Sequence, residues 1–220
     1  MSTPTMIETS EPASPAPEER APARRWGTAA LAIAVVVGLL LGYAGGWLTP
    51  QLTRPGDTSA EAGFARDMLS HHAQAVEMGL VAFDEGADPE VRSIGGDIAT
   101  AQQGEIGTMH TWLRMWGLDP AGSEPSMSWM SDGAGLVKNG LMPGMATPEE
   151  MAKLHAAEGR ELDVLFLQLM IKHHLGGIHM IDGILEVSDE PDVVKTAQTM
   201  KNTQRKDLVN LQNALQRLGG

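Results

Sequence analysis

The stretch FARDMLSHHAQAVEMGL, residues 64–80, recurs 102 positions later as FLQLMIKHHLGGIHMID, residues 166–182. No gap is needed to align the two stretches. The shared pairs are Phe64/Phe166, Met68/Met170, His71/His173, His72/His174 and Met78/Met180. Further pairs follow downstream, among them Pro89/Pro191, Gln102/Gln204 and Gly117/Gly219. Self-similarity at a fixed spacing indicates a duplicated structural unit, so the sequence predicts two copies of one element.

Each copy has the pattern of a helical hairpin. In the first copy, apolar residues at three- and four-residue steps predict a helix over about 60–85 and another over about 89–116. Asp88 is the expected N-cap, Pro89 the first helical residue and Gly117 the stop. No segment shows strand alternation. We therefore predict an all-α fold, a four-helix bundle made of two duplicated hairpins and preceded by one transmembrane helix.

The N-terminal 59 residues divide into three parts. Residues 1–25 are rich in Pro, Ala, Ser and Glu, which predicts a disordered tail. Residues 26–48 carry no charge and are long enough to cross a membrane, and residues 49–59 form a linker. Arg20, Arg24 and Arg25 precede the span, so the positive-inside rule predicts a single-pass protein with a cytoplasmic N-terminus and an extracytoplasmic C-terminal domain. A cleaved signal peptide is the competing interpretation.

Composition excludes several kinds of site. The 220 residues include no cysteine, which removes disulfides, thiolate metal sites and cysteine nucleophiles. A net charge of -12 argues against binding to nucleic acid. The chain nevertheless contains 14 methionines, an unusually high number that points to a use for thioethers.

Histidine, methionine and carboxylate side chains recur on the predicted inner faces. Met68, His71 and Met78 share one face of the first helix, whereas His72 is rotated by about 100° and is expected at a helix seam or in water. Folding the hairpin brings His71 level with Glu105, and the second hairpin brings His173 level with Asp207. The candidate metal ligands are Met68, His71, His72, Met78, Glu105, Met109, Met142, Met145, Met170, His173, His174, His179, Met180 and Asp207.

Two interpretations of this polar layer stay open. In one, it is a satisfied core network in which Glu105 accepts a hydrogen bond from His71 and methionine fills gaps. In the other, imidazole and thioether groups bind a soft cation such as Cu(I) or Ag(I). The irregular loop 118–146 favours the second, because it contains two Met-x-x-Met spacings, at Met127/Met130 and Met142/Met145. His110 and His155 are expected at the surface.

An enzymatic function has little support. Di-iron oxidases built on four-helix bundles carry Glu-x-x-His motifs, but no glutamate stands three residues before any histidine here. Hydrolase, phosphate-loop and dinucleotide motifs are also missing from the sequence. We therefore expect a binding protein and no catalytic residues.

The chain resembles the DUF305 family over about residues 60–218. The segments that carry the resemblance are FARDMLSHHAQAVEM, QQGEIGTMHTWL, GLMPGMATPEEMAKL and FLQLMIKHHLGGIHM. This resemblance implies a ferritin-like four-helix bundle that is secreted or membrane-anchored, with copper binding in some members. It also implies that the residues to watch are His71, His72, His173, His174, Gln102, Glu105, Met109, Met142 and Met145. The second copy departs from the pattern, because Leu211 stands where the first has Met109.

Two functions are therefore expected. The first is a membrane-anchored extracytoplasmic protein that binds copper for sequestration or for handover to a copper-handling partner. The alternative is a non-metal helical module that docks a partner at the membrane through loop 118–146. The sequence does not distinguish oligomeric states.

Overall fold

The structure is a computed structural model that describes residues 27–52 and 54–219. The predicted disordered tail, residues 1–25, and Trp26 lie outside the described residues. The described residues fall into two compact units, one that ends at Leu52 and one that follows it. Within the described residues the regular structure is helical, apart from one isolated bridge between Lys138 and Leu141. The predicted all-α class is confirmed.

The first unit contains helix α1, Thr28–Leu52. Its segment Thr28–Trp47 has a mean hydropathy of 2.1 and none of it is buried. Length and composition therefore make it a candidate membrane span. The helix α6 (Gly159–Val187) passes the same test, but 56% of its apolar window is buried, as expected of a core helix.

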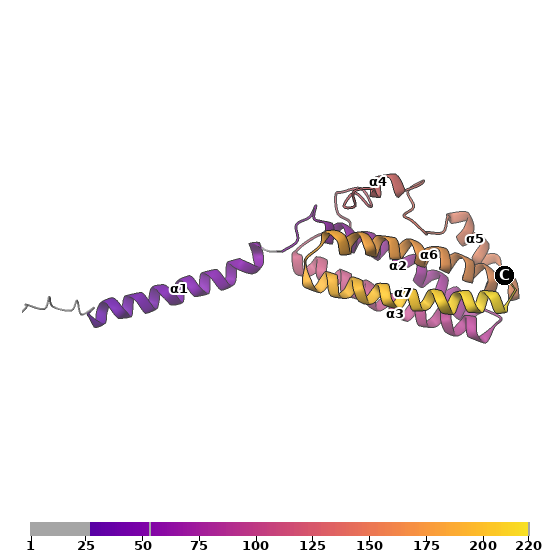
Figure 1. The fold of residues 1–220 in the computed structure, drawn as a ribbon, viewed down its shortest axis with the longest axis horizontal. Coiled ribbons are helices and arrows are strands. Elements are labelled where there is room, and N and C mark those ends of the chain that lie inside the picture. Colours follow the sequence, from indigo (N-terminus) through magenta and orange to yellow (C-terminus); the bar gives the residue numbers. More distant parts are fainter. Residues whose placement is uncertain (1–26, 53, 220) are drawn as a thin grey trace, which may run out of the picture. The chain divides into compact units, whose positions relative to one another are not determined.

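The second unit is a bundle of four long helices joined by an irregular connection (Figure 1). The long helices are α2 (Ala60–Glu85), α3 (Pro89–Trp116), α6 (Gly159–Val187) and α7 (Pro191–Arg217). Two short helices lie in the connection, α4 (Gly133–Leu136) and α5 (Pro148–Ala156). The two hairpins predicted from the repeat, α2–α3 and α6–α7, are therefore present.

Local sequence signals set the helix ends. The carboxylate of Asp88 accepts hydrogen bonds from the backbone N–H groups of Glu90 and Val91, and Pro89 opens α3. Gly117 ends α3 with φ of 75°, a left-handed conformation that glycine adopts without strain. Thr147 and Glu150 form a capping box at the start of α5. These signals explain why the helix bounds coincide with those expected from the sequence.

The two hairpins pack antiparallel, so equivalent contacts occur twice. Asp163 at the start of α6 accepts hydrogen bonds from the backbone of Ala87 and Asp88 in the α2–α3 turn. Its repeat partner, Glu61 at the start of α2, accepts a hydrogen bond from the Ser188 hydroxyl in the α6–α7 turn. The duplication in sequence is thus matched by a duplication of tertiary contacts.

The closest approach of α2 and α3 gives a first prediction. A Cβ on Gly95 would lie 2.6 Å from the carbonyl oxygen of Gly79 and 2.9 Å from the Ala82 Cβ. Because overpacking a close contact is costly, Gly95→Ala should lower the free energy of unfolding by about 1–3 kcal/mol. Gly104→Ala, on the same helix but with no described atom within 4 Å of the new Cβ, should raise it by about 1 kcal/mol. Urea unfolding of both variants tests this, and shifts in the same direction would contradict the close approach.

Candidate metal centre

Two histidines from different hairpins meet at the centre of the bundle. The rings of His71 on α2 and His173 on α6 lie 3.8 Å apart between centroids, at an interplanar angle of 37°. Their exposed fractions are 0% and 1%. Each side chain comes from the middle of its helix, so residues 102 positions apart form one contact.

The neighbouring histidines lie on the other side of each helix, at the seams within the hairpins. His72 Nε2 lies 2.7 Å from Glu105 Oε2, and His174 Nε2 lies 3.4 Å from Asp207 Oδ2. The carboxylate side chains retain 18% and 21% exposure, whereas both imidazoles are fully buried. His72 and His174 thus lie at helix seams, one of the two positions predicted for the second histidine of each pair, and these seams bury the second imidazole as completely as the first.

The predicted pairing of the carboxylates with the histidines is wrong. Glu105 pairs with His72 and not with His71, and Asp207 pairs with His174 and not with His173. The reason is the rotation of about 100° per residue along a helix: His71 faces the opposite hairpin, while His72 faces α3. Glu105 and Asp207 therefore lie at the hairpin seams and not on the innermost stripe.

Each hydrogen bond leaves one ring nitrogen unused. The Nε2–H of His71 donates to the Pro143 carbonyl at 3.0 Å, and the carboxylates accept from the Nε2–H groups of His72 and His174. The buried side-chain atoms of this layer without a hydrogen-bond partner among the described residues are His71 Nδ1, His72 Nδ1, His174 Nδ1, His173 Nε2, Gln102 Oε1 and Gln204 Oε1. Buried polar atoms are normally satisfied, so this concentration of them needs an explanation.

Burial keeps the central imidazoles neutral. Desolvation, helped by the neighbouring His72, lowers the pKa of His71 to about 3, against a smaller opposing effect of the hydrogen bond to Pro143. Desolvation also lowers the pKa of His173 well below its usual range, and nearby histidines, His71 first, add to this. A neutral imidazole offers a lone pair, which is the form that binds a metal ion.

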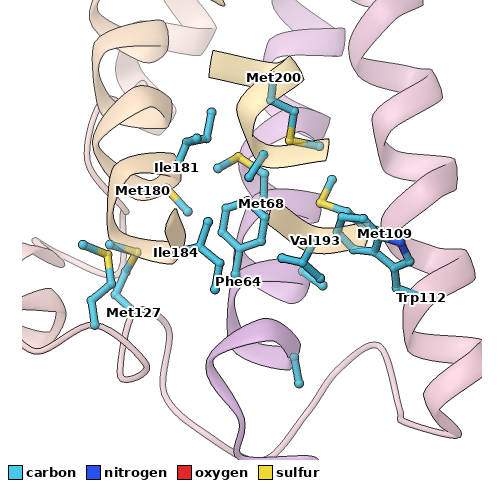
Figure 2. Packing of buried hydrophobic residues seen from close by; sticks show 14 of the residues in the cluster. Phe64, Met68, Met109, Trp112, Met127, Met180, Ile181, Ile184, Val193 and Met200 are labelled. Atoms are coloured by element: carbon cyan, nitrogen blue, oxygen red, sulfur yellow. The ribbon is translucent and has the colours of Figure 1, made fainter. Parts of the chain in front are cut away.

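The thioethers divide unevenly between the two ends of the bundle. One core cluster of sixteen buried residues contains seven methionines. We call these seven the Met-rich cluster: Met68, Met109, Met127, Met130, Met142, Met180 and Met200. In Figure 2 the side chains of Met68, Met109 and Met200 point into the same part of the interior. The opposite cluster, also of sixteen residues, includes two methionines, Met78 and Met170. The predicted inward thioethers are thus in the core, but mostly at one end.

Loop 118–146 contributes part of the Met-rich cluster because a buried carboxylate holds it in place. Asp67, 6% exposed, accepts hydrogen bonds from the backbone N–H of Met127 at 2.7 Å and from Trp129 Nε1 at 2.8 Å. Met127 is fully buried and has a positive φ of 64°. Met142 is 5% exposed, whereas Met145 is partly buried.

The remaining predicted ligand, His179, lies outside the core. Its side chain is 46% exposed and its Nε2 is 4.0 Å from Asp132 Oδ2. His110 and His155 are exposed, as expected. Met200, Asp67 and the Pro143 carbonyl were not among the predicted site residues. The apolar stripe of α7 could have pointed to Met200, but no local signal marks the other two.

The described residues contain no cluster of the usual nitrogen, thiolate and carboxylate metal ligands. Among residues 27–52 and 54–219, no group of three or more His, Cys, Asp or Glu side chains is placed to hold a metal ion.

Comparison with known proteins places this arrangement in a family. The family model described as a domain of unknown function, DUF305, matches residues 61–215. The chain belongs to the DUF305 family. A DUF305 protein from Streptomyces coelicolor, whose structure is described as that of a putative secreted protein, is 40% identical, with a TM-score of 0.68 over 75% of this chain and 97% of that one. The comparison with curated proteins gave no match.

Two further structures share the DUF305 fold. A fragment from Deinococcus radiodurans is 30% identical, with a TM-score of 0.61 over 74% of this chain and 99% of that one. CopM in a Cu(I)-bound form is 20% identical, with a TM-score of 0.56 over 74% of this chain and 99% of that one. At this identity CopM is evidence for the fold alone. The predicted resemblance to DUF305 is confirmed.

Proposed function

We propose that this DUF305 protein binds copper as Cu(I), with Ag(I) and Cu(II) as further ions that the same groups accept. The observation that carries the proposal is the set of four buried imidazoles beside the Met-rich cluster, each with one ring nitrogen that has no hydrogen-bond partner within residues 27–52 and 54–219. Such nitrogens are costly in an empty apolar core. They cost little if a cation uses their lone pairs.

The hydrogen bonds of the histidines support this function. A metal-binding histidine usually donates its other N–H to a carboxylate or a backbone carbonyl, which fixes the tautomer. His72 and His174 donate to Glu105 and Asp207, and His71 donates to the Pro143 carbonyl. In all three the free nitrogen is Nδ1, so the same arrangement orients three lone pairs inside the bundle.

The residues divide into two groups by role. His71 and His173 at the centre, with His72 and His174 beside them, would supply nitrogen, and Met68, Met109, Met142 and Met180 would supply sulfur at the Met-rich end. Met78 and Met170 would serve the other end, where Leu211 replaces the equivalent of Met109. Glu105 and Asp207 would act through the histidines they hold. Met145 and His179 lie farther out.

The location and the task are part of the same proposal. The apolar helix α1 and the preceding arginines favour a membrane anchor with the bundle outside the cytoplasm, and the description of the Streptomyces coelicolor relative as secreted is consistent with that. CopM, a member with the same fold, has been captured with Cu(I) and with Cu(II). No catalytic step is needed: the protein would sequester copper or hand it to a copper-handling partner.

Metal retention tests the proposal. Full-length protein in detergent micelles is exposed under anaerobic conditions to Cu(I), Ag(I), Cu(II), Zn(II) or Fe(II), desalted and analysed for bound metal and for thermal shift. Cu(I) and Ag(I) should be retained and should raise the melting temperature, because binding to the folded state stabilises it. Zn(II) and Fe(II) should be lost on desalting. A chain that stays metal-free with every ion would favour the non-metal docking module instead.

A further inference from the structure

The four histidines are closed off from solvent, so a cation that reaches them needs an opening. Their exposed fractions are at most 1%. Helices surround them on most sides, and separating packed helices would expose the core. Loops open at a lower free-energy cost than core helices do. The opening is therefore expected where a loop, and not a helix, covers the site.

Such a cover exists over His71 and His173. The turn Leu141–Met145, which we call the Met-Pro-Gly-Met turn, places the Pro143 carbonyl 3.0 Å from His71 Nε2. The same turn lies directly on α6, because a Cβ on Gly176 would come within 2.0 Å of the Pro143 oxygen. Gly144, with φ of 82°, approaches the carbonyl of His173 in the same way. The backbone of this turn is thus the segment that covers the central imidazoles on this side.

A pocket lies on the outer side of this turn. It has a volume of about 360 Å³ and is lined by both thioethers of the turn, Met142 and Met145, with Lys138, Thr147 and Lys172 around them. Met142 belongs to the Met-rich cluster and is 5% exposed, while Met145 is partly buried. Both thioethers therefore line the pocket, and that of Met142 also belongs to the core.

Hydrogen bonds hold the turn at both ends, and the hydrogen bond to Pro143 and the packing of Met142 hold it between them. Before it, Lys138 and Leu141 exchange two backbone hydrogen bonds of 3.0 Å. After it, Gln74 on α2 clasps Ala146: its side-chain oxygen accepts from the Ala146 N–H at 2.7 Å, and its amide donates to the Ala146 carbonyl at 2.9 Å. Between these points, the hydrogen bond from His71 to Pro143 joins the turn to the helices. The turn is therefore a short segment anchored by hydrogen bonds at both of its ends.

We propose that the Met-Pro-Gly-Met turn is the port through which the soft cation enters and leaves the histidine core. The cation first binds to Met145 and Met142 from the pocket, and the turn then lifts and passes it to the imidazoles. The two hydrogen bonds between Gln74 and the Ala146 backbone set how readily the turn lifts. This inference rests on the proposed copper-binding function and adds to it the site of exchange.

The kinetics of Ag(I) binding test the port. Full-length protein in detergent micelles is mixed with silver nitrate, and loading is followed by tryptophan fluorescence. Trp112 can report on binding because it belongs to the same group of buried residues as the seven methionines of the Met-rich cluster. Release is followed after transfer to excess chelator. Gln74→Leu removes two hydrogen bonds and should speed both loading and release by about tenfold with an unchanged dissociation constant. Met145→Leu keeps the apolar volume, removes the outer sulfur and should slow loading.

Matched variants serve as controls. Met151→Leu makes the same substitution at another partly buried methionine, packed against the opposite cluster, and Gln168→Leu does so at an exposed glutamine of α6. Both should keep the original rates. If Ag(I) binds but the Gln74 and Met145 variants load and release it at the control rates, the port is overturned while the proposed function stands. If the unaltered chain binds no Ag(I), the proposed function is overturned, and the port with it.

Discussion

Replacing His71 and His173 together by leucine should lower the affinity for Cu(I) by at least about 100-fold, since loss of an outer partner of a ligand already costs about 10–100-fold. The same double substitution should change the stability of the folded bundle little. Leucine is close to histidine in volume, so no cavity opens, and it removes two ring nitrogens that have no hydrogen-bond partner among the described residues. This gain offsets the loss of the hydrogen bond from His71 to the Pro143 carbonyl.

Two measurements separate these effects. Affinity is obtained by anaerobic competition with a Cu(I) chelator of known affinity, and stability by thermal unfolding of the metal-free protein. His110→Leu is the control, because His110 is exposed on α3 and should change neither quantity. A double variant that still competes as well as the unaltered chain would exclude the central imidazoles as ligands. A large drop in melting temperature would show instead that they serve the packing.

The metal-free protein should become much less stable as the pH falls from about 7 to 5.5. Burial lowers the pKa of His71 to about 3 and that of His173 in the same direction. In the unfolded chain both histidines take up protons near pH 6.5, so over this range the unfolded state binds more protons than the folded one. Their contribution to stability is present above pH 6.5 and is lost as the pH falls toward the folded-state pKa values. Two such groups amount to about 3 kcal/mol at pH 5.5.

Urea unfolding at intervals between pH 5.5 and 8 measures this dependence above the range in which ordinary carboxylates titrate. The His71→Leu/His173→Leu variant is the matched control and should show a nearly flat profile. An unaltered chain that keeps its full stability at pH 5.5 would mean that the central imidazoles accept protons in the folded state. That result would contradict their isolation from solvent.

Local features of the fold were predictable, whereas contacts between distant segments were not. Asp88, Pro89 and Gly117 act through their immediate backbone neighbours, so the ends of α3 follow from the sequence. The two hairpins were predictable too, because each copy of the repeat carries its own helical pattern. The meeting of His71 with His173 depends on how the hairpins are set against each other, which no local pattern encodes.

The site was predicted in composition but not in arrangement. Histidine, methionine and carboxylate were expected in one layer, and they are there. The pairing of Glu105 with His72 depends on which face of α2 is turned toward α3, and the helical periodicity of α2 alone does not determine this. The Pro143 carbonyl comes from a turn 72 residues away from His71, and a backbone group leaves no mark in the sequence.

The unequal division of thioethers has a mechanical consequence. Methionine is unbranched and turns about three bonds, so it can adopt many shapes at similar energy. The end of the bundle with seven methionines can refit around guests of different radius by rotating side chains while its backbone stays still. The other end, filled mainly by leucine, alanine and valine, would have to shift whole helices to do the same. The molecule therefore has one compliant end and one stiff end, and discrimination by ionic size should be weak at the first and strong at the second.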